Sequence, residues 1–139
     1  DFGLQKKYFT EQVKISEEFQ KPMIIHCVKA YPDLIALKKE FNPEQYWIVH
    51  GYNGNWQNAD QLIKHGIFLS FGNFLFKQNK KLLQAFKNIP DDRFFLESDE
   101  SETEIEPIYK KAAELREINI SKLIKLMQQN FKKVFDHGL

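Results

Sequence analysis

Three side chains of metal-ligating type follow short apolar segments of the sequence at equivalent points. His26 lies at the end of one such segment, next to its last residue, His50 is the last residue of a second, and Asp99 follows a third after a short gap. Neutral imidazole and carboxylate groups are common protein ligands of zinc and similar divalent ions. A bound cation of this kind can lower the pKa of a water molecule and generate hydroxide near neutral pH. These three residues are therefore candidate metal ligands.

The same residues also allow a simpler interpretation. A single histidine at the end of a strand is commonly a hydrogen-bonded loop residue, and the spacing here matches no compact zinc motif such as HExxH. A shared site is favoured if the three strand ends lie together in space, because ligands of parallel sheets gather beyond the carboxyl ends of the strands. Cys27 follows His26 directly, so we expect it to point to the opposite side and to be buried against a helix.

The segments around these residues alternate between strand-like and helical patterns. Each of four short apolar runs is followed by a stretch with apolar residues at helical spacing, and the runs are 23–27, 46–50, 67–71 and 93–96. A further stripe over 123–135 predicts a C-terminal helix. Nearly continuous apolar strands between helices indicate a parallel sheet covered on both faces. Right-handed crossovers then allow either an open doubly wound sheet or part of a closed barrel.

Composition sets limits on the class of protein. The chain has 139 residues, of which 42% are hydrophobic, and its 20 basic and 19 acidic residues leave a formal net charge of +1. A protein that coats nucleic acid would be more basic, although bound cations can supply positive charge to a nucleic-acid substrate. A single cysteine allows no disulfide within the chain, and no apolar run is long enough for a membrane span. With no secretory signal at its start, we expect a cytoplasmic protein.

Four segments occur in an order and spacing typical of one family. They read KPMIIHC at 21–27, VHGYNG at 49–54, GIFLSFG at 66–72 and IPDDRFFLESD at 89–99. These segments resemble strands five to eight of the TatD-type deoxyribonucleases, which are metal-dependent hydrolases. The resemblance implies an α/β fold made of the last four βα units of a TIM-barrel-like hydrolase, a half barrel with a C-terminal helix. Residues 1–139 would then be the C-terminal part of the domain, with the first four strands missing.

The resemblance also implies roles for individual residues. His26 and His50 match metal-binding histidines of the family, and Asp99 matches a catalytic aspartate that binds metal or orients the attacking water. The family implies divalent ions, Mg²⁺, Zn²⁺ or Mn²⁺, two of them in the intact protein. It also implies phosphodiester hydrolysis, with DNA as the substrate of a nuclease such as a 3′-end exonuclease. Asp1 resembles an aspartate after strand four, so the family's glutamate ligand and its HxH pair would precede it.

Other residues at the same end of the strands are candidates for supporting roles. Glu97 precedes Asp99 by two residues and can share its face, so it is a candidate partner for a ligand histidine. Lys29, Tyr52 and Asn53 lie in the loops expected at this end, where lysine can meet phosphate and an aromatic ring can stack on a base. We therefore predict that these three contact substrate, although packing or solvation explains them equally well.

Two features of the sequence favour alternatives to a working nuclease. The segment after Asp99 is acidic, with Glu100, Glu102, Glu104 and Glu106, and it should repel a polyphosphate unless metals dominate. Four βα units also leave open strand edges, which favour self-association, and two copies could close an eight-stranded barrel by symmetry. The alternatives are an inactive fragment, a pseudo-enzyme, or a module that binds a small phosphate ligand at the strand ends.

Overall fold

The computed structural model describes residues 2–27, 29–98 and 104–135 of the chain. Within this part, four strands form one sheet whose spatial order follows the chain. All three neighbouring pairs are parallel, as the sequence predicted. The strands are β1 (Met23–His26), β2 (Trp47–His50), β3 (Ile67–Phe71) and β4 (Phe94–Leu96).

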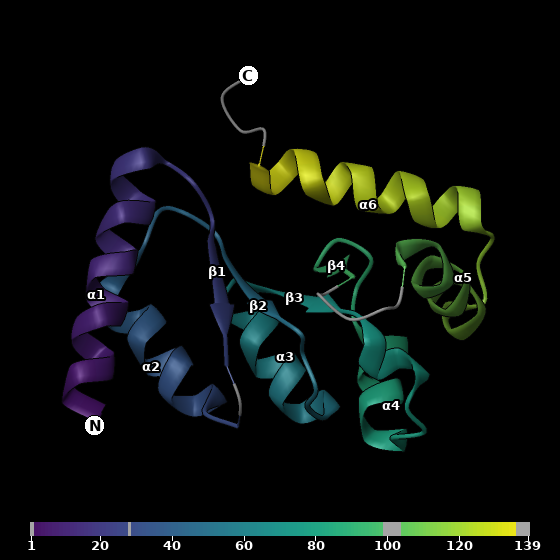
Figure 1. The fold of residues 1–139 in the computed structure, drawn as a ribbon, viewed down its shortest axis with the longest axis horizontal. Coiled ribbons are helices and arrows are strands. Elements are labelled where there is room, and N and C mark those ends of the chain that lie inside the picture. Colours follow the sequence, from purple (N-terminus) through teal and green to yellow (C-terminus); the bar gives the residue numbers. More distant parts are fainter. Residues whose placement is uncertain (1, 28, 99–103, 136–139) are drawn as a thin grey trace.

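Helices precede, connect and follow these strands. They are α1 (Phe2–Phe19), α2 (Tyr31–Phe41), α3 (Trp56–Lys64), the 3-10 helix η1 (Asn73–Phe76), α4 (Lys80–Asn88), α5 (Ile105–Arg116) and α6 (Ile120–Phe135). The first four α-helices lie along one face of the sheet, whereas α6 crosses the opposite face near β4 (Figure 1). None of the helices in the described part of the chain is long and apolar enough to cross a lipid bilayer.

The connections decide between the two topologies that the sequence left open. The crossover helices α2, α3 and α4 all lie on the same face, and each strand is added next to the one before it (Figure 1). A doubly wound sheet reverses its strand order and places helices on both faces. Successive βα units on one face are instead the pattern of a TIM barrel. The chain therefore forms four βα units of a TIM-barrel-like fold, a half barrel, with two helices after the last strand.

The second face of the sheet is less covered than the sequence suggested. We expected strands buried on both faces, and β3 meets this expectation because all five of its residues are buried. In β1, however, buried and exposed residues alternate, and Ile24 is 63% exposed. The cause is the reach of α6, because the cluster formed by its Val134 includes Ile48 and Phe68 but does not extend to β1.

Aromatic rings fill the space between the sheet and α4. Phe71 packs edge-to-face against Phe86 with ring centroids 4.9 Å apart, and Phe86 packs against Phe94 at 5.3 Å. Tyr52 adds a fourth ring, 5.7 Å from Phe71. All four rings are 0% exposed, and a buried aromatic side chain removes about 150–250 Å² from water. This cluster is therefore a major source of stability at the carboxyl half of the sheet.

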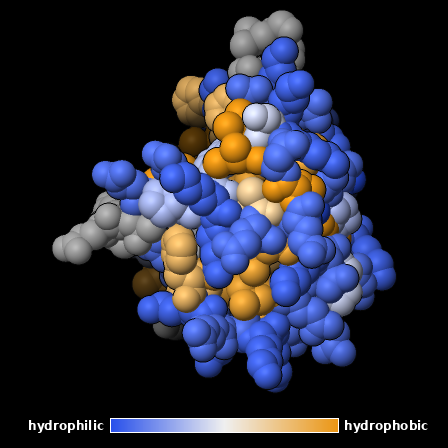
Figure 2. Space-filling model, turned by 90° about the vertical axis from the view of Figure 1, so that its right-hand side faces the viewer, coloured by the Kyte–Doolittle hydropathy of each residue, from blue (hydrophilic) through white to orange (hydrophobic). Residues whose placement is uncertain are grey.

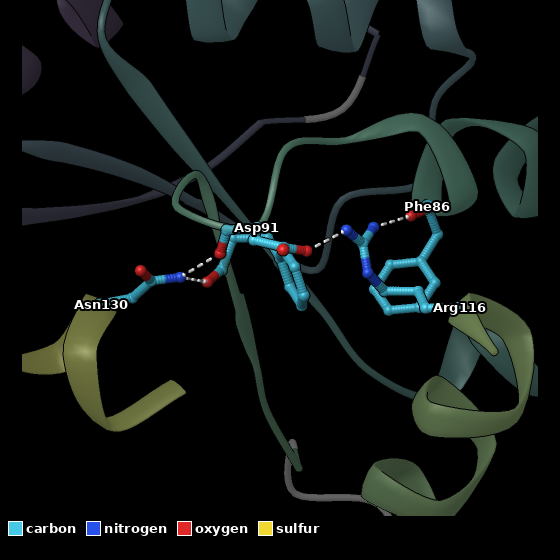
Figure 3. A network of polar contacts seen from close by, with 5 residues as sticks. Phe86, Asp91, Arg116 and Asn130 are labelled. Carbon is cyan, nitrogen blue, oxygen red and sulfur yellow. Dashed lines mark hydrogen bonds and ion pairs between the residues drawn. The ribbon is translucent and has the colours of Figure 1, made fainter. Parts of the chain in front are cut away.

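A network of polar contacts ties the turn before β4 to the last two helices (Figure 3). In α6, Nδ2 of Asn130 donates to the carbonyl oxygens of Asp91 at 2.8 Å and Phe94 at 2.9 Å. At the end of α5, Arg116 donates to the carbonyl oxygen of Phe86 at 2.6 Å and to the Asp91 carboxylate at 2.6 Å. Because Asn130 is 3% exposed, its hydrogen bonds are shielded from water. The network holds α6 beside β4.

Candidate metal centre at the strand ends

His26 and His50 lie side by side at the carboxyl ends of β1 and β2. The two residues are paired in the register of the parallel strands, so their side chains leave the sheet on the same face. Their ring centroids are 6.2 Å apart, with 44° between the ring planes. The His50 side chain is 38% exposed, and His26 is exposed as well. Both imidazoles are therefore accessible on the face of the sheet that α6 covers only in part, which we call the open face.

Glu97, just after β4, links the ends of three strands. Its Oε2 contacts Nδ1 of His50, and its Oε1 accepts a hydrogen bond from the backbone nitrogen of Gly51 at 2.5 Å. Gly51 has φ 63°, a left-handed conformation that glycine adopts without strain. The Glu97 side chain is 16% exposed, so solvent competes little for this carboxylate. The contact orients the His50 ring and leaves Nε2 as the nitrogen that can meet a cation.

Gly72, at the end of β3, allows Glu97 to come this close. The backbone nitrogen of Glu97 donates to the carbonyl oxygen of Phe71 at 2.9 Å. A Cβ atom on Gly72 would lie 2.9 Å from the carbonyl oxygen of Glu97 and 3.1 Å from its Cγ. In the sequence, Gly72 stood out only as the last residue of the segment GIFLSFG, and this role was not predicted. The available signal was a glycine next to a polar strand end, which often marks close backbone approach.

The described donors fit part of a metal site. Two imidazoles on one face, one of them oriented by a carboxylate, suit zinc and similar divalent ions. Within residues 2–27, 29–98 and 104–135, no group of three or more His, Cys, Asp or Glu side chains could hold a metal ion. Asp99, the predicted third ligand, and Asp1 lie outside the described residues. The roles of His26, His50 and Asp99 as ligands stay predictions.

Tyr52 does not occupy the position that the sequence suggested. We predicted that it would contact substrate, but it is 0% exposed and its hydroxyl donates to the carbonyl oxygen of Asn55 at 2.6 Å. Burial raises the pKa of its phenol, and the nearby Tyr31 adds to this effect. The prediction that Tyr52 contacts substrate is therefore wrong for this structure, because the turn after His50 folds the ring into the core.

Lys29 and Asn53 are brought together by the fold. Both line a hollow of about 400 Å³ at the carboxyl end of the sheet, and both are exposed. Lys29 has φ 59°. Their contact with substrate stays a prediction, but the structure gives these two predicted residues a common location.

Cys27 lies on the other side of β1 from His26, as expected. It is partly buried and packs against the main core cluster. Burial raises the pKa of its thiol, so the thiolate form that binds metal or attacks a substrate is disfavoured. Cys27 therefore packs against the core in this structure, as the sequence predicted.

Comparisons with known proteins agree with this fold. A family model described as TatD related DNase matches residues 2–136. YabD of Bacillus subtilis, an uncharacterized metal-dependent hydrolase, is 28% identical over 147 residues, covering 95% of this chain and 58% of YabD. The deoxyribonuclease Tat-D of Schizosaccharomyces pombe is 28% identical over 106 residues, covering 75% of this chain and 34% of that protein.

A solved structure shows the same architecture. YJJV, a TatD homologue of Escherichia coli, matches with a TM-score of 0.84 at 17% identity, covering 97% of this chain and 57% of that chain. The fold thus defines the class, a TIM-barrel-like α/β protein. The chain belongs to the TatD related DNase family, which confirms the resemblance found in the sequence. It spans somewhat more than half the length of YabD.

Proposed function

We propose that this chain supplies two metal-binding histidines and their support to a hydrolase that cuts phosphodiester bonds in nucleic acid. The observation that carries the proposal is the pair His26 and His50 on one open face, with Glu97 against His50. Membership of a hydrolase family supports the reaction class. The curated deoxyribonuclease Tat-D supports DNA as the substrate.

Each residue has a distinct task in this proposal. His26 and His50 present imidazole nitrogens to a divalent ion such as Mg²⁺, Zn²⁺ or Mn²⁺, and Glu97 keeps the His50 ring in one orientation. Asp99 is proposed as a further ligand that also orients or deprotonates the attacking water. When bound, the metal, one ion or two, would neutralise phosphate charge and lower the pKa of a water molecule.

The test compares three histidine variants of the full-length protein. We expect His26→Ala and His50→Ala to lower metal content and hydrolysis of a DNA oligonucleotide together, with metal measured by mass spectrometry. His65→Ala is the matched control, because the His65 ring bonds the carbonyl oxygen of Gln61 at the end of α3, away from the strand ends. Normal metal content and turnover in both strand-end variants would defeat the proposal.

Measuring metal binding and the hydrolysis of DNA and RNA oligonucleotides on the same protein separates the enzyme from its alternatives. A protein that binds the divalent ion through His26 and His50 but leaves the oligonucleotide intact would be a binding module or a pseudo-enzyme. Hydrolysis of an RNA oligonucleotide in preference to DNA would keep the reaction class and change the substrate.

A further inference from the structure

Beyond the two histidines, the carboxyl end of the sheet has a second polar feature. The hollow of about 400 Å³ that contains Lys29 and Asn53 also reaches the first turns of α3 and α4. Its polar lining combines two lysines with four asparagines: Lys29, Lys81, Asn53, Asn55, Asn58 and Asn79. Among the described residues that line it there is no Asp or Glu, so the charged side chains seen in this lining are both cationic.

Two of the four asparagines of this hollow are oriented as hydrogen-bond donors toward a ligand. Oδ1 of Asn55 accepts from the backbone nitrogen of Asn58 at 2.8 Å, which caps α3. Oδ1 of Asn79 accepts from the backbone nitrogens of Lys81 at 3.1 Å and Leu82 at 3.4 Å, which caps α4. Because these oxygens already serve the helix ends, what each amide can offer a ligand is its NH₂ group. Together with two ammonium groups, this set of donors suits an anion with several oxygen atoms.

The chain limits the distance between this hollow and the histidines. Lys29 is three residues after His26, and Asn53 is three residues after His50. Three residues of fully extended chain span at most about 11 Å. Along one strand of nucleic acid, charges recur about every 3.4 Å of the helix axis. The hollow is therefore within about three nucleotides of the candidate metal centre.

We propose that this hollow binds a phosphate of the nucleic-acid strand, about one to three nucleotides from the bond that is cut. The proposal rests on the proposed function and adds a subsite that the metal ligands do not provide. Lys29 and Lys81 contact the phosphate oxygens, and the NH₂ groups of Asn55 and Asn79 fix their position. Contacts of this kind position a strand and carry no sequence information. The subsite sets the register of the strand over the histidines.

The experiment measures binding without hydrolysis. A fluorescently labelled single-stranded DNA oligonucleotide is titrated with the protein in EDTA, over a series of salt concentrations. The double variant Lys29→Gln with Lys81→Gln removes both cations of the hollow. The control, Lys87→Gln with Lys125→Gln, changes the net charge by the same amount at two exposed lysines outside the hollow. Circular dichroism checks that both proteins are folded.

Loss of one phosphate contact has a defined signature. We expect the hollow variant to bind several-fold more weakly, and its plot of log affinity against log salt to be shallower by about 0.7, the value for one phosphate of a single strand. The control variant should keep the slope of the unmodified protein. Equal affinity and slope in the two double variants would overturn the subsite. Because no metal is present, this result is independent of whether the protein hydrolyses DNA.

Discussion

The face of the sheet that packs against α1 to α4 is closed, whereas the opposite face is covered only in part. On the closed face, Trp47, Leu69 and Phe94 are 0% exposed. On the opposite face, α6 buries Phe68 to 1% exposure, but Ile24 on β1 remains 63% exposed. The difference separates two tasks: contacts on the closed face stabilise the fold, and the open face carries the groups that can meet a cation.

Apolar side chains are also exposed at both edges of the sheet. Beside β1, Ile15, Phe19 and Ile24 are exposed, and beside β4, Ile120, Ile124 and Phe131 are exposed. Figure 2 shows apolar residues gathered on the side of the molecule that carries α5 and α6. Both outer strands run in the same direction, so β1 of one copy can continue the sheet next to β4 of another. We expect this pairing because it would bury the exposed apolar side chains that lie beside β1 and β4.

The largest effect is expected on the closed face. Phe71→Ala should lower the free energy of unfolding by about 3–5 kcal/mol, because it leaves a cavity among Tyr52, Phe86 and Phe94. Urea denaturation measures the change. Phe74→Ala, at a side chain that is 38% exposed, serves as the control and should cost clearly less. Equal losses in the two variants would contradict the conclusion that the buried ring cluster stabilises the fold more than an exposed ring does.

The next effect concerns the helix that covers part of the open face. Asn130→Ala should lower the free energy of unfolding by about 1–3 kcal/mol, because two carbonyl oxygens lose their donor. Gln129→Ala changes the exposed neighbour on the same helix and should have little effect. Dye binding to exposed apolar surface should rise only in the Asn130 variant. An unchanged urea midpoint would show that α6 is held by its apolar contacts alone.

A change in free energy of similar size, in metal binding rather than in folding, is expected at the strand ends. Glu97→Gln removes the charge that orients His50 and should weaken divalent-cation affinity about 10-fold to 100-fold in the full-length protein. Calorimetric titration with zinc measures this directly. Glu114→Gln, at an exposed residue of α5, should leave the affinity unchanged. If Glu97→Gln destabilises the fold but not the metal complex, Glu97 supports structure rather than the site.

The apolar edges lead to a prediction about association. We expect the 139-residue chain to form dimers in sedimentation equilibrium, with β1 of each copy beside β4 of the other. Ile24→Glu should raise the dissociation constant about tenfold, because it puts a charge in the interface. Gln61→Glu adds the same charge on α3 and should not. A strictly monomeric chain that unfolds cooperatively would contradict this pairing.

The smallest effect follows from buried phenols. Burial raises the pKa of Tyr31, Tyr52 and Tyr109 above the ordinary value for tyrosine. Their neutral forms therefore stabilise the fold fully below the unfolded-state pKa of about 10, and this contribution is lost as the pH rises. The free energy of unfolding, measured by urea denaturation, should fall slightly as the pH rises from about 9 to about 11, because the unfolded chain ionises these phenols more readily than the folded chain does. Tyr109→Phe should reduce the slope.

Prediction from the sequence succeeded where the signal was local. The strand that ends at His50 and the helix that follows it could be read from apolar spacing within a few residues. The same reasoning failed for Tyr52, because a loop position does not reveal that the turn at Gly51 sends the next ring into the core. The cover of Ile24 was overestimated for a similar reason, since it depends on how far α6 reaches.

The amino-acid sequence by itself determined the four βα units and the strand ends at which His26 and His50 lie, because both follow from patterns within single segments. Only the tertiary structure decided that Glu97 contacts His50, that Gly72 makes room for Glu97, and that Lys29 shares a hollow with Lys81. These contacts join residues far apart in the chain, and their geometry depends on the packing of the whole sheet.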